Sequence, residues 1–287
     1  MKIAITGSDG YIGTRLQREF ATDPSVELVC LSIITDAAPY VKVIFDHDNL
    51  VRVFDGIDCV VHLAAKKAVK DYTDFQDNVN LTNTVIDAAI DSKVKKFILA
   101  SSISVYSDEK TIPWNEDTAA DSDSLYGISK LTSEQILKVK GKKAGMAYTS
   151  LRFGHVIGEE MPGNYMIPSF FRKAVAKETL TVIGESVARR ELVDVIDICR
   201  AVHWAANNPL TDNQVLNIGS GIAVTNLEIA NFMSRAFGKL KVDYDDSQNE
   251  GIKSSCMDIS KAQGMGFTPK YTPETSIIRV AKYMKGE

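Results

Sequence analysis

Four cysteines and four histidines are scattered through the 287-residue chain, and no two cysteines form a CxxC pair. A structural metal site usually takes its ligands from closely spaced cysteine and histidine residues, so we expect no bound metal. Cys30 and Cys59 lie in apolar runs typical of buried strands, which favours free thiols over disulfides. These features predict a protein of a reducing compartment, the cytoplasm.

Long hydrophobic runs are also missing. No stretch approaches the roughly 18 apolar residues that a membrane-spanning helix needs, and the chain opens directly on a strand-like segment at residues 2–6. The formal net charge of −4 provides no excess of basic residues of the kind that binds nucleic acid. We therefore expect neither a membrane nor a nucleic acid as partner.

Short apolar runs alternate with helical stretches through the first half of the chain. The runs occupy residues 2–6, 28–31, 41–45, 59–63, 97–100 and 149–153. This pattern predicts βαβ units and an α/β fold with a doubly wound parallel sheet of the Rossmann type, which binds ligands at the carboxyl ends of its strands.

The alternation breaks after residue 153 and returns at 190–206. We expect a dinucleotide-binding Rossmann domain made of residues 1–153 and 190–206. The remaining residues, 154–189 and 207–287, are expected to form a smaller C-terminal substrate-binding lobe.

A glycine turn, GSDGYIG at residues 7–13, follows the first run and opens an apparent helix that extends to about Phe20. Glycine permits a tight turn and close approach of the backbone, and a helix N-terminus offers N–H groups to a pyrophosphate. The order of strand, turn and helix favours dinucleotide binding over a merely structural turn. The expected cofactor contacts are Gly7, Gly10, Tyr11, Ile12 and Gly13.

The end of the second run leaves the choice between NAD and NADP open. An acidic residue there binds the adenosine ribose of NAD, whereas an arginine suits the extra phosphate of NADP. Ser32 occupies this place, no arginine stands beside it, and Asp36 is the nearest acid in the following loop. The absence of an arginine beside Ser32 favours NAD. Asp46 and His47 follow the third run, where they are placed to contact adenine; for Asp46, capping of the loop is an equally good interpretation.

Two YxxxK patterns occur in the chain, Tyr106 with Lys110 and Tyr126 with Lys130. A tyrosine that moves a proton near neutral pH needs its pKa lowered from about 10, and a lysine one helical turn away supplies a charge of the right sign. Residues 107–113 have a loop composition, and in a loop this spacing does not align two side chains. We therefore predict Tyr126 and Lys130 as the proton-transfer pair.

The helix expected from Tyr126 carries an apolar stripe on the side opposite to the pair. Its members are Ile128, Leu131, Ile136 and Val139. The run at 97–100 ends in Ser101 and Ser102, and a strand-end hydroxyl is the partner that such a pair requires. We choose Ser102 as the third catalytic residue, against the alternative of a serine that only bonds a loop N–H.

These residues together resemble the extended short-chain dehydrogenase/reductase family, in its NAD-dependent epimerase/dehydratase group. The likeness covers nearly the whole chain. It includes TGSDGYIG at 6–13, HLAA at 62–65, NVNLT at 78–82, SSISVY at 101–106, YGISK at 126–130, LRFGHVIG at 151–158, RELVDVID at 190–197, NIGSG at 217–221 and DISKA at 258–262.

The resemblance implies that Ser102 polarises the substrate oxygen, Tyr126 acts as acid and base, and Lys130 holds the nicotinamide ribose. Lys67 matches a cofactor phosphate contact of UDP-galactose 4-epimerases, and Asn78 matches the family asparagine near the active site, where it is also suited to cap a helix. Further cofactor contacts are expected from Leu63, Ala64, Ala65 and Ala100.

Some positions depart from the family pattern. Ile103 and Ser104 stand where 4,6-dehydratases carry an Asp-Glu pair, which argues against water elimination. His155 replaces an asparagine usual in nucleotide-sugar epimerases, and Gln248 lies near the place of a second diphosphate-binding arginine. Arg190 remains to clamp a phosphate, or to pair with a neighbouring carboxylate. The expected substrate contacts are therefore Ser102, His155 and Arg190.

The leading hypothesis is an epimerase of a sugar, most reasonably a nucleotide sugar, that oxidises a hydroxyl to a ketone and returns the hydride to the other face. The alternative is a reductase or dehydrogenase of another carbonyl or hydroxyl compound, which His155 and Gln248 favour. A third class is a nucleotide-sensing binding protein, which would not need the catalytic residues. The resemblance also implies a homodimer formed through helices near 82–90 and 126–139.

Overall fold

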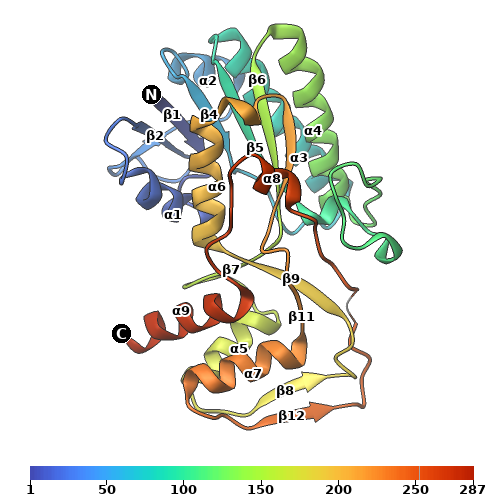
Figure 1. The fold of residues 1–287 in the computed structure, drawn as a ribbon. Helices are drawn as coiled ribbons and strands as arrows, with labels where there is room; N and C mark the ends of the chain where they lie inside the picture. The colour runs from blue at the N-terminus through green and yellow to red at the C-terminus, as the bar shows by residue number, and fades with distance from the viewer. Residues whose placement is uncertain (252) are drawn as a thin grey trace.

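A seven-stranded parallel sheet forms the centre of the larger lobe in the computed structural model, which describes residues 1–251 and 253–287 (Figure 1). From one edge to the other, its strands are β10 (Gln214–Ile218), β6 (Ala147–Phe153), β5 (Lys96–Ser102), β4 (Cys59–His62), β1 (Lys2–Thr6), β2 (Glu27–Ser32) and β3 (Tyr40–Lys42). Because β1 lies between β2 and β4, the winding reverses beside β1, and ligands of such sheets bind at this reversal. The predicted doubly wound α/β fold is confirmed.

Helices cover both faces of this sheet. One face carries α1 (Tyr11–Phe20), α6 (Val195–Asn207) and α8 (Ser260–Gly264); the other carries α2 (His47–Val53), α3 (Tyr72–Asp91) and α4 (Leu125–Ala144). Successive strand residues point to opposite faces, so Ile3 and Ile5 pack in one core cluster with Leu16 of α1, while Ala4 packs in the other with Leu50 of α2. The glycine turn before α1 is therefore held at the carboxyl end of a strand that is buried on both faces.

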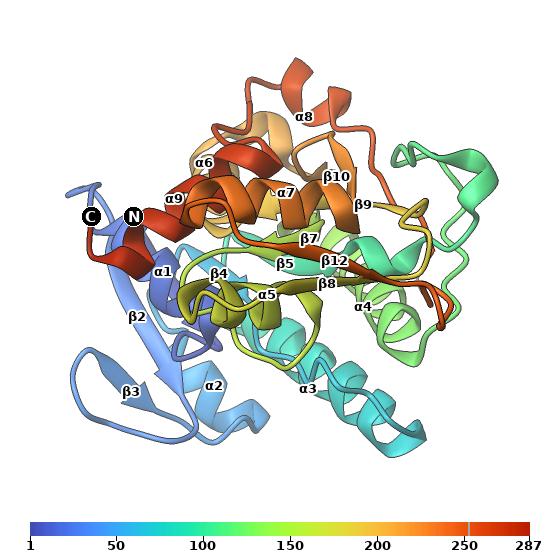
Figure 2. The same ribbon diagram turned by 90° about the horizontal axis from the view of Figure 1, so that it is seen from below.

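The smaller lobe lies below the large sheet in Figure 1 and in front of it in Figure 2. Its three-stranded sheet has the order β11 (Ala223–Thr225), β9 (Arg189–Asp194) and β7 (His155–Ile157), and β8 (Leu180–Ile183) pairs with β12 (Val242–Asp245). Its helices are α5 (Met166–Val175), α7 (Asn226–Phe237) and α9 (Pro273–Lys285). Phe171, Met233 and Ile277, one from each helix, are buried in its separate core.

The expected division of the chain between the lobes needs two corrections. Residues 207–287 are expected in the smaller lobe, but β10 pairs in parallel with β6 and extends the large sheet, and Ala262 of α8 packs in the core of that sheet. Leu216 and Ile218 of β10 are fully buried there, so the sheet edge gains an apolar strand that the irregular sequence around it did not reveal. Residues 190–194 were expected in the Rossmann domain, but β9 pairs with β7 and β11.

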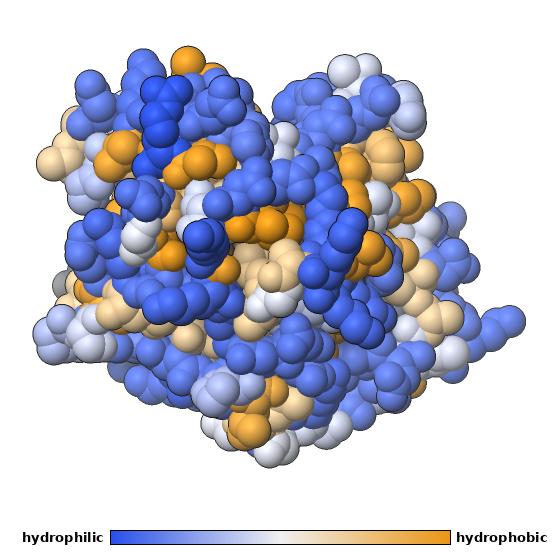
Figure 3. Space-filling view, turned by 90° about the horizontal axis from the view of Figure 1, so that it is seen from above, coloured by the Kyte–Doolittle hydropathy of each residue, from blue (hydrophilic) through white to orange (hydrophobic). Residues whose placement is uncertain are grey.

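Three short 3₁₀ helices complete the described elements: η1 (Ile103–Val105), η2 (Glu109–Thr111) and η3 (Pro209–Thr211). Among the described residues, no helix combines the length and apolarity that a bilayer crossing requires. The end of the molecule at which β1 begins is mostly hydrophilic, with hydrophobic residues in separate patches (Figure 3). All four cysteines are buried as free thiols.

Candidate active site

A cavity of about 430 Å³ lies at the carboxyl ends of β1, β4 and β5. Its lining includes twelve residues that the sequence predicts as cofactor contacts: Gly7, Gly10, Tyr11, Ile12, Gly13, Leu63, Ala64, Ala65, Lys67, Ala100, Tyr126 and Lys130. It also includes residues that the sequence did not single out: Asp9, Ser101, Phe153, Val156, Met161, Pro162 and Tyr165. The glycine turn and the proton-transfer pair thus face one space.

The glycine turn brings the start of α1 against the end of β1. Gly7 has φ +69°, and a Cβ on Gly13 would lie 2.3 Å from the carbonyl oxygen of Gly7, so the helix packs on the turn more closely than any side chain allows. Gly10 at the N-cap of α1 makes no side-chain cap hydrogen bond. The first N–H groups of α1 therefore remain available to an anion, which fits the pyrophosphate of a dinucleotide.

Tyr126 and Lys130 lie on the first turns of α4, which begins after the N-cap Ser124. A Cβ on Gly127 would lie 1.9 Å from the carbonyl oxygen of Ser104, so the missing side chain lets α4 approach the end of β5. The Lys130 Nζ donates a hydrogen bond of 2.8 Å to the carbonyl of Ala100 and lies 5.8 Å from the centre of the Tyr126 ring. The structure thus brings the two predicted side chains together on one helix beside β5.

Burial changes the acidity of both members of this pair. Burial raises the pKa of Tyr126 to about 12, and a hydrogen bond with the Ser102 side chain acts in the opposite direction. Burial lowers the pKa of Lys130 to about 8, although the carboxylate of Glu134 partly opposes this. The phenol is therefore the resting form near pH 7, and positive charge close to its oxygen favours the phenolate.

The two strand-end serines differ in what they contact. Ser101 is 3% exposed, and its hydroxyl donates to the carboxylate of Glu134. The Ser102 hydroxyl donates to the Ser104 hydroxyl and accepts from the backbone N–H of Ser104, both at 3.1 Å, and it lies near enough to Tyr126 to act on the pKa of the phenol. Ser101 lines the cavity and Ser102 does not, but the carboxylate of Glu134 engages the Ser101 hydroxyl. The proximity to Tyr126 therefore favours Ser102 of the two serines.

The other YxxxK pair is not arranged for catalysis. Tyr106 follows η1 and Lys110 lies in η2, so one helix does not carry both. Tyr106 is 4% exposed, and its hydroxyl lies 2.7 Å from Arg152 Nη1 and donates to Asn217 Oδ1 at 2.9 Å. Tyr106 is a buried structural tyrosine.

The apolar stripe of α4 only partly faces the core. Leu131 and Ile136 are partly buried and pack against core clusters, whereas Ile128 and Val139 are 39% and 66% exposed. The buried face of the helix carries Gly127, Ser129, Lys130, Ser133, Glu134, Leu137 and Gly141. Small residues on this face allow close packing, and Ile128 and Val139 are left on the outside.

A second cavity, of about 600 Å³, adjoins the first and shares Lys67, Val156, Pro162 and Tyr165 with it. His155 and Arg190, both predicted substrate contacts, line it. Desolvation within the cleft, with the nearby charges of Arg190 and Lys67, lowers the pKa of His155 to about 4. The imidazole is therefore neutral near pH 7, although the ring is exposed to the cleft.

Arg190 is not engaged by the neighbouring carboxylates. Glu191 accepts hydrogen bonds from the backbone N–H groups of Gly221 and Met257, and Asp194 binds Arg279. The Nε of Arg190 is buried and has no hydrogen-bond partner among the described residues. Of the two roles considered for Arg190, the structure favours a guanidinium kept available for an anion in the cavity.

Four predicted cofactor contacts, Ser32, Asp46, His47 and Asn78, do not line the cavity. Ser32 is buried at the end of β2. Asp46 is the N-cap of α2 and accepts from Asn49 N at 2.8 Å, which is the capping role, and the ring of His47 lies 2.9 Å from Asp91. Asn78 lies within α3, whose N-cap is Asp71, so it caps no helix. The Asn78 amide instead exchanges two hydrogen bonds of 2.8 Å with the backbone of Lys66 and thereby fixes the loop that carries Lys67.

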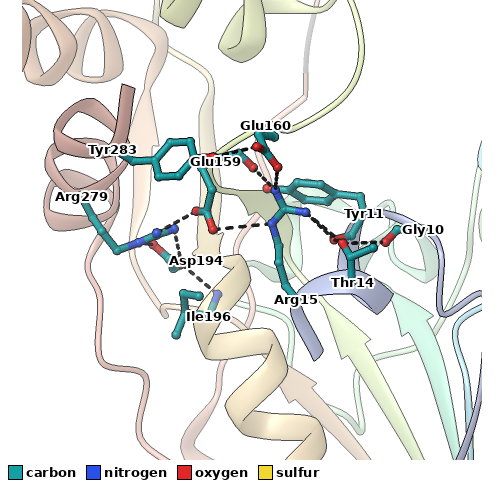
Figure 4. Close-up of polar contacts among 10 residues, drawn as sticks. All are labelled: Gly10, Tyr11, Thr14, Arg15, Glu159, Glu160, Asp194, Ile196, Arg279 and Tyr283. Atoms are coloured by element: carbon teal, nitrogen blue, oxygen red, sulfur yellow. Dashed lines mark hydrogen bonds and ion pairs between the residues drawn. The ribbon is translucent and has the colours of Figure 1, made fainter. Parts of the chain in front are cut away.

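A cluster of charges around Arg15, Glu159 and Arg279 holds the segment at residues 158–165 (Figure 4). Met161, Pro162 and Tyr165 of this segment line the cavity. Arg15 of α1 donates to the carbonyl oxygen of Glu159 at 2.6 Å, and Arg279 of α9 lies 2.7 Å from its carboxylate. Burial disfavours the charge of Glu159, but its own backbone N–H and the two arginines outweigh burial and lower its pKa.

Arg279 also binds both oxygens of the fully buried Asp194 at 2.9 Å. The cluster therefore joins the start of α6, the C-terminal helix α9 and the helix that follows the glycine turn. The sequence did not predict it, because Arg15, Glu159 and Arg279 are far apart along the chain.

Comparison with known proteins places this site in a family. The model of the NAD dependent epimerase/dehydratase family matches residues 3–219. The chain is 27% identical to a UDP-glucose 4-epimerase of Lactobacillus helveticus, over 98% of this chain and 96% of that protein.

Solved structures are similar over the whole chain. A UDP-N-acetylglucosamine 4-epimerase from Bacillus cereus has a TM-score of 0.92 and 34% identity, with 100% of both chains covered. A Thermus thermophilus UDP-glucose 4-epimerase in complex with NAD has a TM-score of 0.87 and covers 100% of this chain and 99% of its own; at 22% identity it supports the fold alone. The protein therefore belongs to the NAD-dependent epimerase/dehydratase family.

Proposed function

We propose that the protein is an NAD-dependent 4-epimerase of a UDP-sugar. The observation that carries the proposal is that Tyr126 and Lys130 line the same cavity as the glycine turn, with Ser102 next to Tyr126 at the end of β5. Membership of the family and the names of the similar proteins, UDP-glucose and UDP-N-acetylglucosamine 4-epimerases, supply the substrate class.

The chemistry divides between the cofactor and three side chains. The glycine turn and Lys130 would hold NAD, whose nicotinamide would, when bound, accept the hydride and give it back. Tyr126 takes the proton from the sugar hydroxyl as that carbon is oxidised, and returns it to the keto oxygen after the sugar has turned. The Ser102 hydroxyl donates a hydrogen bond to the same oxygen and holds it beside the phenol.

The phenol of Tyr126 needs help to act as a base, because burial raises its pKa to about 12. Each unit by which the pKa falls again requires about 1.36 kcal/mol of stabilisation of the phenolate. The Lys130 ammonium, on the same helix as Tyr126, acts in this direction. Since the pKa of Lys130 is about 8, this contribution is lost at alkaline pH.

The second cavity suits the diphosphate of the substrate. Arg190 lines this cavity and has no carboxylate partner among the described residues, and Lys67 lines both cavities. A guanidinium binds phosphate oxygens at two points, which fixes the nucleotide and leaves the sugar to reach Tyr126. The neutral His155 offers a hydrogen bond without adding charge.

The other functions considered are less well supported. Ile103 and Ser104 provide no acid-base pair for dehydration. A net reductase would use the same catalytic residues, but the similar proteins named above are epimerases, which disfavours it. A nucleotide-sensing protein would not require a hydroxyl, a phenol and a buried lysine in one place.

A homodimer is part of the proposal, as is a cytoplasmic location. The exposed Ile128 and Val139 on α4, beside α3, offer an apolar surface for a second copy of the chain. The buried free thiols fit a reducing compartment.

The test is to denature the purified protein and measure nucleotide in the supernatant. An epimerase regenerates its cofactor in each turnover and has no need to release it, so we expect close to one NAD per chain. Protein that leaves purification without nucleotide, and that needs added cofactor in proportion to product, would support a reductase instead.

A further inference from the structure

The carboxyl end of β2 holds a serine where an acid was expected, and this serine has no hydrogen-bonding capacity left. Ser32 is 1% exposed. Its hydroxyl donates to Asp9 Oδ2 at 2.6 Å and accepts from the backbone N–H groups of Ile34 and Thr35 at 3.0 and 3.2 Å. A hydroxyl has one donor and two acceptor positions, so Ser32 is fully used in supporting Asp9.

Asp9 reaches this corner from the glycine turn rather than from the strand. The neighbouring Ser8 donates to the carbonyl oxygen of Leu31 at 2.8 Å and so ties the turn to the end of β2. Asp9 is partly exposed and lines the cavity, which Ser32 does not. Among the described residues, its hydrogen bond from Ser32 uses only Oδ2, which leaves Oδ1 for a ligand.

We propose that Asp9 supplies the carboxylate that binds the adenosine ribose of NAD and that it makes the enzyme select NAD over NADP. This inference rests on the proposed NAD-dependent function. A carboxylate accepts hydrogen bonds from ribose hydroxyls, whereas it repels the 2′-phosphate of NADP. The acid that usually stands at the end of β2 is absent here. Asp9, two residues after Gly7 in the turn before α1, takes over its role, and Ser32 positions the Asp9 carboxylate.

Two other charged residues near the end of β2, Asp36 and Lys42, are alternative determinants of the choice between NAD and NADP. Asp36, the nearest acid after β2, is exposed in the loop and does not line the cavity. Lys42 of β3 is the register partner of Ser32 and is exposed; a base at this place would favour the 2′-phosphate. Within the described residues, Lys42 forms no ion pair with Asp9, so the carboxylate keeps its negative charge uncompensated.

The test compares binding of NAD and of NADP to nucleotide-free protein, by isothermal titration calorimetry without any sugar. A hydrogen bond to a charged group is worth about tenfold to a hundredfold in affinity. We expect wild type to bind NAD at least about 30-fold more tightly than NADP. Asp9→Asn should reduce that preference at least about tenfold, and Asp36→Asn should leave it unchanged.

Ser32→Ala is the second variant. It should reduce the preference in the same direction but less than Asp9→Asn, because Asp9 stays in the turn without its support. Far-ultraviolet circular dichroism and the thermal midpoint of each variant verify that it is folded. An unchanged preference in folded Asp9→Asn, a loss in Asp36→Asn, or equal wild-type affinity for both nucleotides would overturn the inference.

The proposed epimerase reaction can fail independently of this inference. If Asp9 selects NAD but no UDP-sugar is converted, only the proposed reaction is wrong. If UDP-sugars are epimerised while Asp9→Asn keeps the full preference for NAD, only the role of Asp9 is wrong.

Discussion

Glu134 and Arg152 form a buried ion pair joined at two points: Arg152 Nε lies 3.0 Å from Oε1, and Nη2 lies 2.7 Å from Oε2. Glu134 follows Lys130 by one turn of α4 and also accepts a hydrogen bond from Ser101. The negative charge of Glu134 raises the pKa of Lys130, although burial lowers it by more. The ion pair therefore connects β6, β5 and α4 directly behind the proposed catalytic residues and helps to keep Lys130 charged.

Glu134→Gln is expected to move the alkaline limit of activity to lower pH. Lys130 has a pKa near 8, and without the carboxylate this value falls, so the ammonium is lost earlier as pH rises. The measurement is the pH dependence of kcat/KM between pH 6 and 10. An alkaline limb at the wild-type position would contradict the role given to Glu134. Glu274→Gln, in an exposed pair with Arg235, is the matched control and should shift nothing.

Tyr126→Phe is expected to lower kcat by about 10² to 10⁴, the contribution of a positioned acid-base group, while NAD binding persists. Tyr106→Phe is the matched control. It removes a buried hydroxyl bonded to Arg152 and Asn217, so it should lower the free energy of unfolding by about 1–3 kcal/mol and change kcat by a few-fold at most. A collapse of kcat in Tyr106→Phe with normal turnover in Tyr126→Phe would mean that the wrong pair has been chosen.

Arg190→Met is expected to raise KM for a UDP-sugar at least about tenfold and to change kcat much less. The reason is that a charged contact to phosphate, remote from the reacting carbon, contributes to binding in ground and transition states alike. Arg189→Met is the adjacent control, because Arg189 is exposed and pairs with Glu228. Steady-state kinetics of both variants decides the point, and equal KM values for the two would remove Arg190 from the substrate site.

Arg279→Met is expected to lower the free energy of unfolding by about 3 kcal/mol. It leaves the fully buried Asp194 and the nearly buried Glu159 without their shared counter-charge, and uncompensated buried charges are costly. Urea unfolding gives the value. Arg235→Met, which removes an exposed pair, should cost at most about 1 kcal/mol. Similar losses in both variants would show that the cluster adds nothing beyond a surface ion pair.

Much of the site was predictable because its parts follow local rules. The glycine turn, the start of α1 and the YxxxK spacing each depend on a few adjacent residues, and the structure places all of them around one cavity. The contacts that hold these parts were not predictable in the same way. Asp9 meets Ser32 across 23 residues and Arg15 meets Glu159 across 144, and neither spacing leaves a periodic signal.

Two errors have a common physical cause. β9 and β10 were assigned to the wrong lobe because an isolated apolar run does not reveal which sheet accepts it; tertiary pairing decides. The exposed Ile128 and Val139 of α4 likewise show that amphipathic spacing predicts an apolar face but not what covers each residue of it. The contact between Glu134 and Lys130 could have been predicted from the sequence, because the two residues are four apart on one helix, the spacing at which oppositely charged side chains meet.

Proton NMR of UDP-glucose and UDP-N-acetylglucosamine, incubated with purified protein and no added cofactor, tests the proposed epimerisation itself. At least one of the two is expected to be converted to its 4-epimer over many turnovers per bound NAD, with no net accumulation of NADH. Absence of any 4-epimer from protein that carries NAD, or an oxidised product formed in step with NADH, would contradict the proposed epimerisation.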